Sequence, residues 1–151
     1  MEEKKIRRGE VYFVDLGERH GSIQKGKRPC IVIQNNTGNK NAPTTIMVPT
    51  TSQEKTPLPT HVDLSSVHQL VTGTKALTEQ PFTIDQSEVK GYICTLDKHL
   101  IARVNIGLLI SLGLRNFIEW KKLKSSMRNK KSQSGNKNEE EISFEKMKGG
   151  I

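Results

Sequence analysis

The sequence has few of the residues on which several protein classes depend. Of its 151 residues, two are cysteine and 5% are aromatic. Both cysteines, Cys30 and Cys94, lie in apolar strand-like runs, where a free thiol behaves as a small hydrophobic side chain, so we expect them to be buried and reduced. No segment approaches the ~18 consecutive apolar residues of a membrane-spanning helix, and the charged start, MEEKKIRR, is unlike a signal peptide. We therefore expect a cytoplasmic protein.

Familiar catalytic motifs are also absent. There is no P-loop, no glycine-rich dinucleotide loop, no nucleophile elbow and no pair of cysteines or histidines at zinc-binding spacing. The four histidines are scattered along the chain, and among them His61 is either a general base or a polar strand residue. The sequence leaves that choice open, because a general base is recognised by its geometry.

Positive charge is what the sequence has in excess, and most of it lies at the C-terminal end. The net charge is +8. Residues 1–120 carry 15 Lys and Arg against 12 Asp and Glu, whereas residues 121–151 carry 9 against 4. We therefore divide the chain into a domain, 1–120, and a basic tail, 121–151, whose polar composition predicts disorder. Any case for nucleic-acid binding by the domain must come from particular residues, because its bulk charge supports only weak contact with phosphates.

The domain reads as a series of short strands followed by a helix. Runs of β-branched, aromatic and alternating residues predict strands at 10–15, 30–34, 44–48, 60–64, 75–77 and 91–96. Glycine, proline and asparagine separate these runs, including a dense turn cluster at 35–39. From Asp97 to Leu114 the apolar spacing becomes helical, with Thr95 and Asp97 as candidate caps, although Gly107 and Gly113 count against one unbroken helix. The pattern predicts a small, mainly β barrel with a C-terminal helix.

Two polar segments could carry chemistry. The loop 21–29 contains three cations and places Arg28 at the start of a strand, where its planar guanidinium suits a phosphate. A solvated basic loop is an equal alternative for this segment. The second segment, 49–53, places hydroxyl groups at the end of the third strand, where they either close a turn or donate to a phosphoryl oxygen.

Taken together, these segments resemble the MazF/PemK family of toxin endoribonucleases over roughly residues 7–114. Seven fragments fall in family order. They are Arg8-Gly9-Glu10-Val11-Tyr12, Lys27-Arg28-Pro29-Cys30-Ile31-Val32-Ile33-Gln34-Asn35, Thr37-Gly38-Asn39, Pro59-Thr60-His61-Val62, Thr78-Glu79-Gln80, Thr95-Leu96-Asp97 and Ile110-Ser111-Leu112-Gly113-Leu114.

The resemblance implies an SH3-like barrel with a C-terminal helix that works as a homodimer, with RNA across the interface. It further implies a toxin of a type II toxin-antitoxin system that cleaves single-stranded mRNA at a short recognition sequence without a metal ion or other cofactor. In this family the ribose 2′-hydroxyl attacks the adjacent phosphate and leaves a 2′,3′-cyclic phosphate and a 5′-hydroxyl. A cognate antitoxin is the expected protein partner.

The resemblance also assigns residues. Arg28 takes the place of the catalytic arginine, and Thr51 that of the catalytic threonine, with Thr50 as its rival. The residues implied to bind RNA are Ser22, Gln24, Lys27 and Gln80. The chain departs from many relatives at Ile23, where they carry glutamate, and this predicts a different cleavage specificity.

Two other functions compete with cleavage. The related CcdB toxins use the same barrel to inhibit DNA gyrase through a protein contact, and a gyrase binder would not need Arg28 and Thr51. A small barrel can also bind single-stranded RNA without cutting it, through charge and stacking. The low aromatic content weakens that alternative.

Overall fold

The structure, a computed structural model, describes residues 5–116, 122, 124–125 and 127–128. The chain divides into two compact units, residues 1–113 and 114–151, and the fold described below is that of the first. Its elements are β1 (Glu10–Asp15), β2 (Lys27–Val32), α1 (Asn36–Asn41), β3 (Thr44–Thr51), β4 (His61–Asp63), β5 (Lys75–Leu77), β6 (Phe82–Asp85), the 3-10 helix η1 (Gln86–Glu88), β7 (Tyr92–Thr95) and α2 (Lys98–Ser111). The prediction for residues 121–151 lies largely outside the described residues.

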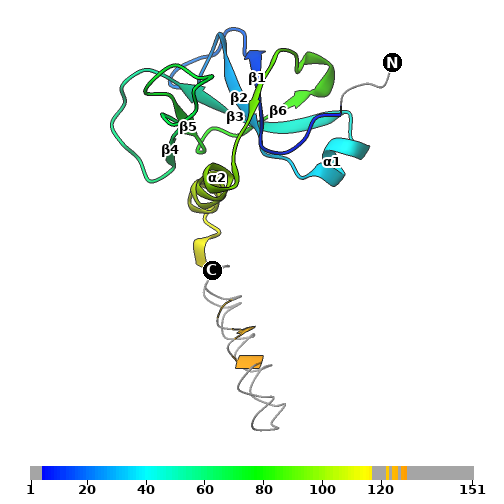
Figure 1. Cartoon of the computed structure of the whole chain (residues 1–151), viewed down its shortest axis with the longest axis vertical. Helices are drawn as coiled ribbons and strands as arrows, with labels where there is room; N and C mark the ends of the chain where they lie inside the picture. The colour runs from blue at the N-terminus through cyan, green and yellow to red at the C-terminus, as the bar shows by residue number, and fades with distance from the viewer. Residues whose placement is uncertain (1–4, 117–121, 123, 126, 129–151) are drawn as a thin grey trace. The chain divides into compact units, whose positions relative to one another are not determined.

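The described strands form one curled antiparallel sheet in the order β4-β5-β3-β2-β1-β7 (Figure 1). The long strand β3 organises it, because its two ends have different partners. Thr44–Met47 pairs with β6, whereas Thr50 and Thr51 pair with β5. The mainly β, SH3-like architecture with a C-terminal helix is thus confirmed, as a half-barrel.

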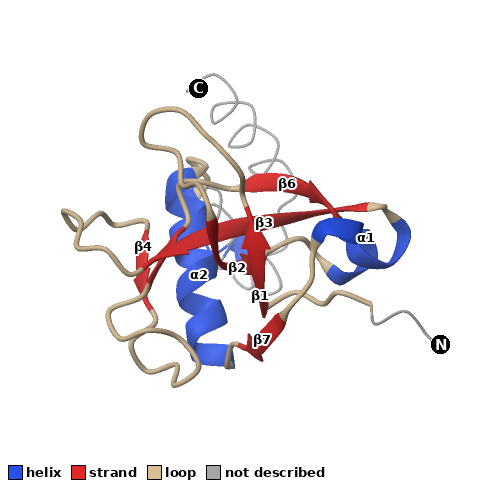
Figure 2. Cartoon of the chain, turned by 90° about the horizontal axis from the view of Figure 1, so that it is seen from above, coloured by secondary structure: helices blue, strands red, loops and turns tan. Residues whose placement is uncertain are grey.

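Apolar side chains pack on both faces of the sheet, because successive residues of a strand point to opposite sides. On one face, Val11, Ile31 and Val48 are buried against Leu100 and Val104 of α2, which crosses that face (Figure 2). The other face has a second buried cluster, which includes Tyr12, Val14, Cys30, Val32 and Met47. Each fully buried aliphatic side chain contributes ~1.5–3 kcal/mol, so this double core fixes the strand register.

The C-terminal helix begins where the sequence predicts. Asp97 is the N-cap, and its carboxylate accepts a hydrogen bond of 2.9 Å from the backbone N–H of Leu100. Gly107 does not interrupt the helix. The helix ends at Ser111, so the prediction that it continues to Leu114 is wrong by three residues. No helix in the described part of the chain is long and apolar enough to cross a membrane.

Other elements differ from the sequence predictions. The turn cluster at 35–39 is instead the start of helix α1, which is N-capped by the Asn35 side chain at 2.7 Å from the Gly38 N–H. Strand β2 begins at Lys27, three residues before the predicted start, because Lys27 and Arg28 pair with the end of β1. Strand β6 was not predicted, and β3 continues three residues further, to Thr51.

Candidate active site

The neighbouring strands β2 and β3 bring Arg28 and Thr51 together. The pairing of β2 with β3 ends at Cys30 opposite Pro49, and beyond it Nη1 of Arg28 donates to the Thr50 carbonyl at 3.1 Å, next to Thr51 in the chain. Arg28 and Thr51 both line a pocket of about 190 Å³. Its other lining residues are Lys27, Pro29, Thr50, Ser52, Gln53, Val71 and Thr74.

Hydrogen bonds within the protein fix the Arg28 guanidinium. Its Nε donates to the Lys25 carbonyl at 2.9 Å, and its Nη1 donates to the Thr50 carbonyl at 3.1 Å and to Oε1 of Gln24. These bonds use all three N–H groups of Nε and Nη1. The two N–H groups of Nη2 have no partner among the described residues, which leaves one amino group of a fixed cation available to a ligand.

The adjacent threonines differ in what their hydroxyl groups do. Both side chains are buried, at 1% exposure for Thr50 and 3% for Thr51, and the Thr50 hydroxyl donates to the Pro29 carbonyl at 2.7 Å. The Thr51 hydroxyl accepts from the Gln53 N–H at 3.2 Å, and its hydrogen has no acceptor among the described residues. Thr51 therefore retains a donor for a ligand, whereas the Thr50 donor is committed to the fold.

The four residues expected to bind RNA differ in how far the fold already uses their side chains. Ser22 and Lys27 are exposed, and Lys27 lines the pocket. Gln24 is 9% exposed and accepts from Arg28 through its side chain. The Gln80 side chain accepts from the Gln24 N–H at 2.9 Å and donates to the Ser22 carbonyl at 3.2 Å. The two glutamines thus hold the β1–β2 loop and Arg28 together.

His61 lies outside this pocket and is engaged elsewhere. Its Nδ1 accepts from the Leu58 N–H at 3.3 Å, and its Nε2 lies 3.0 Å from Oε1 of Glu79. Because Nδ1 is an acceptor, Nε2 carries the hydrogen and donates to the carboxylate. Both ring nitrogens are used, so this arrangement does not offer His61 as a base to a ligand in the pocket. The Glu79 partnership was not identified from the sequence, because the two residues lie on different segments.

Two residues of the pocket wall were missed from the sequence, whereas Ser52 and Gln53 lie in the predicted polar segment 49–53. Val71 and Thr74 come from the loop between β4 and β5. The fold of the whole chain brings this loop to the pocket, so no local sequence signal identified Val71 or Thr74.

Cys30 is near Arg28 but is not a nucleophile in this environment. Burial raises the pKa of its thiol to about 12, although the positive charge of Arg28 acts in the opposite direction. A thiol is reactive as its thiolate, so Cys30 is inert at neutral pH. No group of three His, Cys, Asp or Glu side chains that could hold a metal ion occurs among the described residues.

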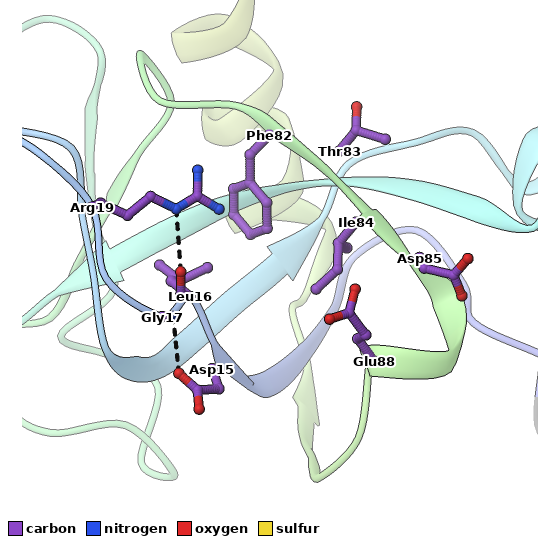
Figure 3. Close-up of a pocket in the computed structure, with 9 residues that line it drawn as sticks. All are labelled: Asp15, Leu16, Gly17, Arg19, Phe82, Thr83, Ile84, Asp85 and Glu88. Atoms are coloured by element: carbon purple, nitrogen blue, oxygen red, sulfur yellow. Dashed lines mark hydrogen bonds between the residues drawn. The ribbon is translucent and has the colours of Figure 1, made fainter.

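Another pocket, of about 440 Å³, lies beside β6 and the end of β1 (Figure 3). Its lining includes three carboxylates, from Asp15, Asp85 and Glu88, against one cation, Arg19. The Arg19 Nε donates to the Leu16 carbonyl at 3.2 Å. This excess of negative charge repels a phosphate, so the larger volume of this pocket does not make it a site for a nucleic-acid backbone.

Comparisons with known proteins found a family and relatives that this chain resembles. Residues 7–112 match a family described as the PemK-like, MazF-like toxin of type II toxin-antitoxin systems. A curated relative from Staphylococcus epidermidis, "Endoribonuclease MazF", is 41% identical over 114 residues, which cover 74% of this chain and 95% of the relative.

Solved structures share the fold. A mycobacterial endoribonuclease in complex with its cognate antitoxin is 25% identical, with a TM-score of 0.62, over 72% of this chain and 96% of that one. MazF from Deinococcus radiodurans is 23% identical, with a TM-score of 0.64, over 74% of this chain and 99% of that one.

Proposed function

This chain belongs to the PemK-like, MazF-like toxin family of type II toxin-antitoxin systems, and from that membership we propose that it cleaves single-stranded mRNA without a metal ion or other cofactor. The 41% identity to an endoribonuclease over almost the whole of that relative supports the activity. The pocket that joins Arg28 and Thr51 favours cleavage over a CcdB-like contact with gyrase, since such a contact needs neither donor.

The reaction is an internal displacement at phosphorus. The ribose 2′-oxygen loses its proton and forms a bond to the adjacent phosphorus, while the bond from phosphorus to the 5′-oxygen breaks. The departing 5′-oxygen takes up a proton, so the products are a 2′,3′-cyclic phosphate and a 5′-hydroxyl. Negative charge builds on the non-bridging oxygens during the attack, and donors that already point at them stabilise the transition state.

Arg28 and Thr51 are the donors that fit this task. Nη2 of Arg28 supplies charge-assisted hydrogen bonds and the Thr51 hydroxyl supplies a neutral one, both from one pocket. The observation that carries the proposal is the guanidinium whose Nε and Nη1 are held by the protein while Nη2 stays free among the described residues. Loss of one such donor lowers the rate by about 10²- to 10³-fold.

The proposed function also implies three partners: the RNA substrate, a second copy of the chain and a cognate antitoxin. Ser22, which is exposed, and Lys27, which is exposed and lines the pocket, contact the RNA as it crosses the interface of a homodimer in the cytoplasm. The solved mycobacterial complex with its antitoxin supports a cognate antitoxin for this chain. Such an antitoxin blocks cleavage by covering the pocket.

The test is cleavage of a long unstructured RNA in the presence of EDTA, with the fragment ends mapped. Arg28→Ala and Thr51→Ala are compared with matched controls, Arg19→Ala and Thr83→Ala, which alter the acidic pocket instead. We expect discrete EDTA-resistant cuts with 5′-hydroxyl ends that disappear in the first two variants and persist in the controls. If the wild-type protein leaves a broad set of RNAs intact, the nuclease proposal fails, and binding to gyrase and to RNA becomes the next measurement.

A further inference from the structure

We propose that Gln24 is a positioning residue, which holds the Arg28 guanidinium in the orientation that presents Nη2 to the scissile phosphate, and that Gln80 in turn holds Gln24. This inference rests on the proposed role of Arg28. It replaces the direct RNA contact expected for Gln24 and Gln80 with a role inside the protein.

Three acceptors surround the guanidinium, and one of them is a side chain. The carbonyls of Lys25 and Thr50 belong to the backbone, so substitution at those positions leaves them in place. Oε1 of Gln24 is the side-chain acceptor, and it shares Nη1 with the Thr50 carbonyl. Of the three acceptors, the Gln24 side chain is therefore the one that a substitution can remove.

Gln24 is itself held in place from a distant part of the chain. The Gln80 side-chain amide accepts from the Gln24 N–H at 2.9 Å and donates to the Ser22 carbonyl at 3.2 Å. It thus bonds to the loop backbone through both its donor and its acceptor, as a neighbouring strand would. Gln80 follows β5, and its own N–H donates to the Leu77 carbonyl at 3.1 Å. The loop that carries Gln24 is consequently tied to the sheet.

The burial of Gln24 separates positioning from direct contact. The residue is 9% exposed, and its carbonyl oxygen already accepts a hydrogen bond from a cation. A long, flexible arginine loses considerable rotamer freedom when it is fixed. When Arg28 is already fixed before the substrate binds, no further rotamer freedom of this side chain is lost in the reaction. The hydrogen bonds of Nη2 then contribute fully to stabilising the transition state.

The two roles predict different kinetics. A residue that contacts RNA contributes mainly to affinity, so its loss raises the dissociation constant and leaves the rate at saturating RNA unchanged. A residue that aims Arg28 contributes to the rate of the bound complex. The measurement is therefore a single-turnover cleavage rate at saturating RNA, together with the dissociation constant for the same RNA carrying a 2′-deoxy nucleotide at the cleavage site, which cannot react.

The variants are made in the full-length chain. Gln24→Met keeps the length of the side chain and removes the acceptor, whereas Gln24→Glu keeps an acceptor. Gln69→Met is the matched control, since Gln69 is exposed and does not line the pocket. We expect Gln24→Met to lower the saturating rate by about 10- to 100-fold. The dissociation constant should change by less than about threefold, Gln24→Glu should recover part of the rate, and Gln69→Met should behave as wild type.

A second experiment asks whether Gln24 acts through Arg28. On an Arg28→Ala background, Gln24→Met should cause no further loss of rate, because the group that it aims is gone. An equal fold-loss in both backgrounds would overturn the proposal, as would a weaker dissociation constant with an unchanged saturating rate.

Nuclear magnetic resonance tests the positioning without cleavage. The ¹⁵N signal of the Arg28 side chain should show faster hydrogen exchange and faster guanidinium rotation in Gln24→Met than in wild type, while thermal unfolding checks that the variant folds. If wild-type protein fails to cut RNA but these changes occur, the proposed function fails and the positioning stands. If the Arg28 signal is the same in both proteins, the positioning is wrong, whether or not the protein cuts RNA.

Discussion

At the scale of single residues, the end of β3 shows how neighbouring identical side chains acquire different duties. Thr50 and Thr51 alternate between the faces of the sheet. Thr50 pairs with Ala76, which belongs to the core beneath α2, whereas Thr51 pairs with Lys75 on the other face. The donor of Thr50 is used by the fold and that of Thr51 remains for a ligand. Alternation within one strand therefore separates a hydroxyl that the fold uses from the one that we propose to be catalytic.

The threonine pair gives the first prediction. Thr50→Val leaves the Pro29 carbonyl without its partner, and we expect it to lower the free energy of unfolding by about 1–3 kcal/mol. Thr51→Val should instead lower the cleavage rate by about 10²- to 10³-fold, with a smaller effect on stability. Urea unfolding and single-turnover cleavage of both variants check this contrast. If Thr50→Val lost as much cleavage as Thr51→Val at equal folded fraction, the assignment of the two hydroxyls would be reversed.

The Cys30 thiol gives a prediction about alkaline pH. Burial raises its pKa from 9.0 to about 12 in the folded protein, so the folded state keeps the proton that the unfolded state releases. The stability from this group is complete below pH 9 and is lost between pH 9 and about 12, with a slope of at most about 1.4 kcal/mol per pH unit.

Urea unfolding between pH 8 and pH 11 measures that slope in wild type and in Cys30→Ala. The variant loses packing at every pH, but it should show a shallower decline above pH 9. The other groups that ionise in this range, such as Tyr12 and Cys94, are common to both proteins and cancel in the comparison. Parallel curves would show that Cys30 ionises as easily in the folded state as in the unfolded one.

At this scale, the sequence predicted the residue types of the candidate site but not the bonds among them. Arg28 and Thr51 were assigned through the family resemblance, because the two segments alone left a solvated loop and a closed turn as alternatives. The pairing of Gln24 with Gln80 joins positions 56 residues apart, and that of His61 with Glu79 joins positions 18 apart. Such bonds depend on the fold of the whole sheet, so a local reading could not distinguish an RNA contact from a positioning contact.

At the scale of elements, α2 shows why a helix can tolerate a glycine. A Cβ at Gly107 would lie 2.5 Å from the Thr78 Oγ1, which is closer than real contacts allow. Thr78 cannot easily move, because its hydroxyl donates to the Thr60 carbonyl at 2.5 Å in a buried bond. The glycine lowers helix propensity but lets α2 approach the sheet. Close packing therefore explains the residue that, on propensity alone, counted against an unbroken helix.

This packing predicts the effect of Gly107→Ala. Ordinary helix propensity would make the change stabilising by ~1 kcal/mol. We expect a net destabilisation of about 1–3 kcal/mol, because the new methyl group must displace Thr78 or push α2 outward. On a Thr78→Ala background the same change should cost much less, and unfolding of the four proteins in this cycle measures the difference. A stabilising Gly107→Ala in the wild-type background would show that the helix is free to adjust.

Elements with a strong local signal were predicted best. Strand β1 and the start of α2 follow from β-branched runs and from the Asp97 cap. Helix α1 was missed because its asparagines favour turns, and the tertiary bonds of Asn39 to Gln34 and Thr45 decide the conformation. Strand β6 was missed for two reasons. Its conformation depends on pairing with β3, and none of its four residues is buried.

At the scale of the whole molecule, charge is distributed unevenly. The pocket with Arg28 also contains Lys27 and no carboxylate, whereas the pocket beside β6 contains three carboxylates. Within the first unit this difference directs a polyanion toward Arg28. Residues 121–151 hold 9 of the 24 Lys and Arg side chains in the chain, against 4 acidic ones. Their contribution to RNA affinity can be separated from that of the pocket, because counterion release depends on salt.

The last prediction concerns these basic residues and uses the full-length chain. Replacing five lysines, at positions 121, 122, 124, 130 and 131, by glutamine makes residues 121–151 electrically neutral. If these lysines contact phosphates, the slope of the logarithm of the RNA dissociation constant against that of salt becomes shallower, by up to about 3.5, because each contact with a single strand contributes about 0.7. Cleavage positions should not change, since the proposed catalytic pair lies in the first unit. An unchanged slope would show that these five lysines make no phosphate contacts, and altered cleavage positions would mean that they also take part in sequence recognition.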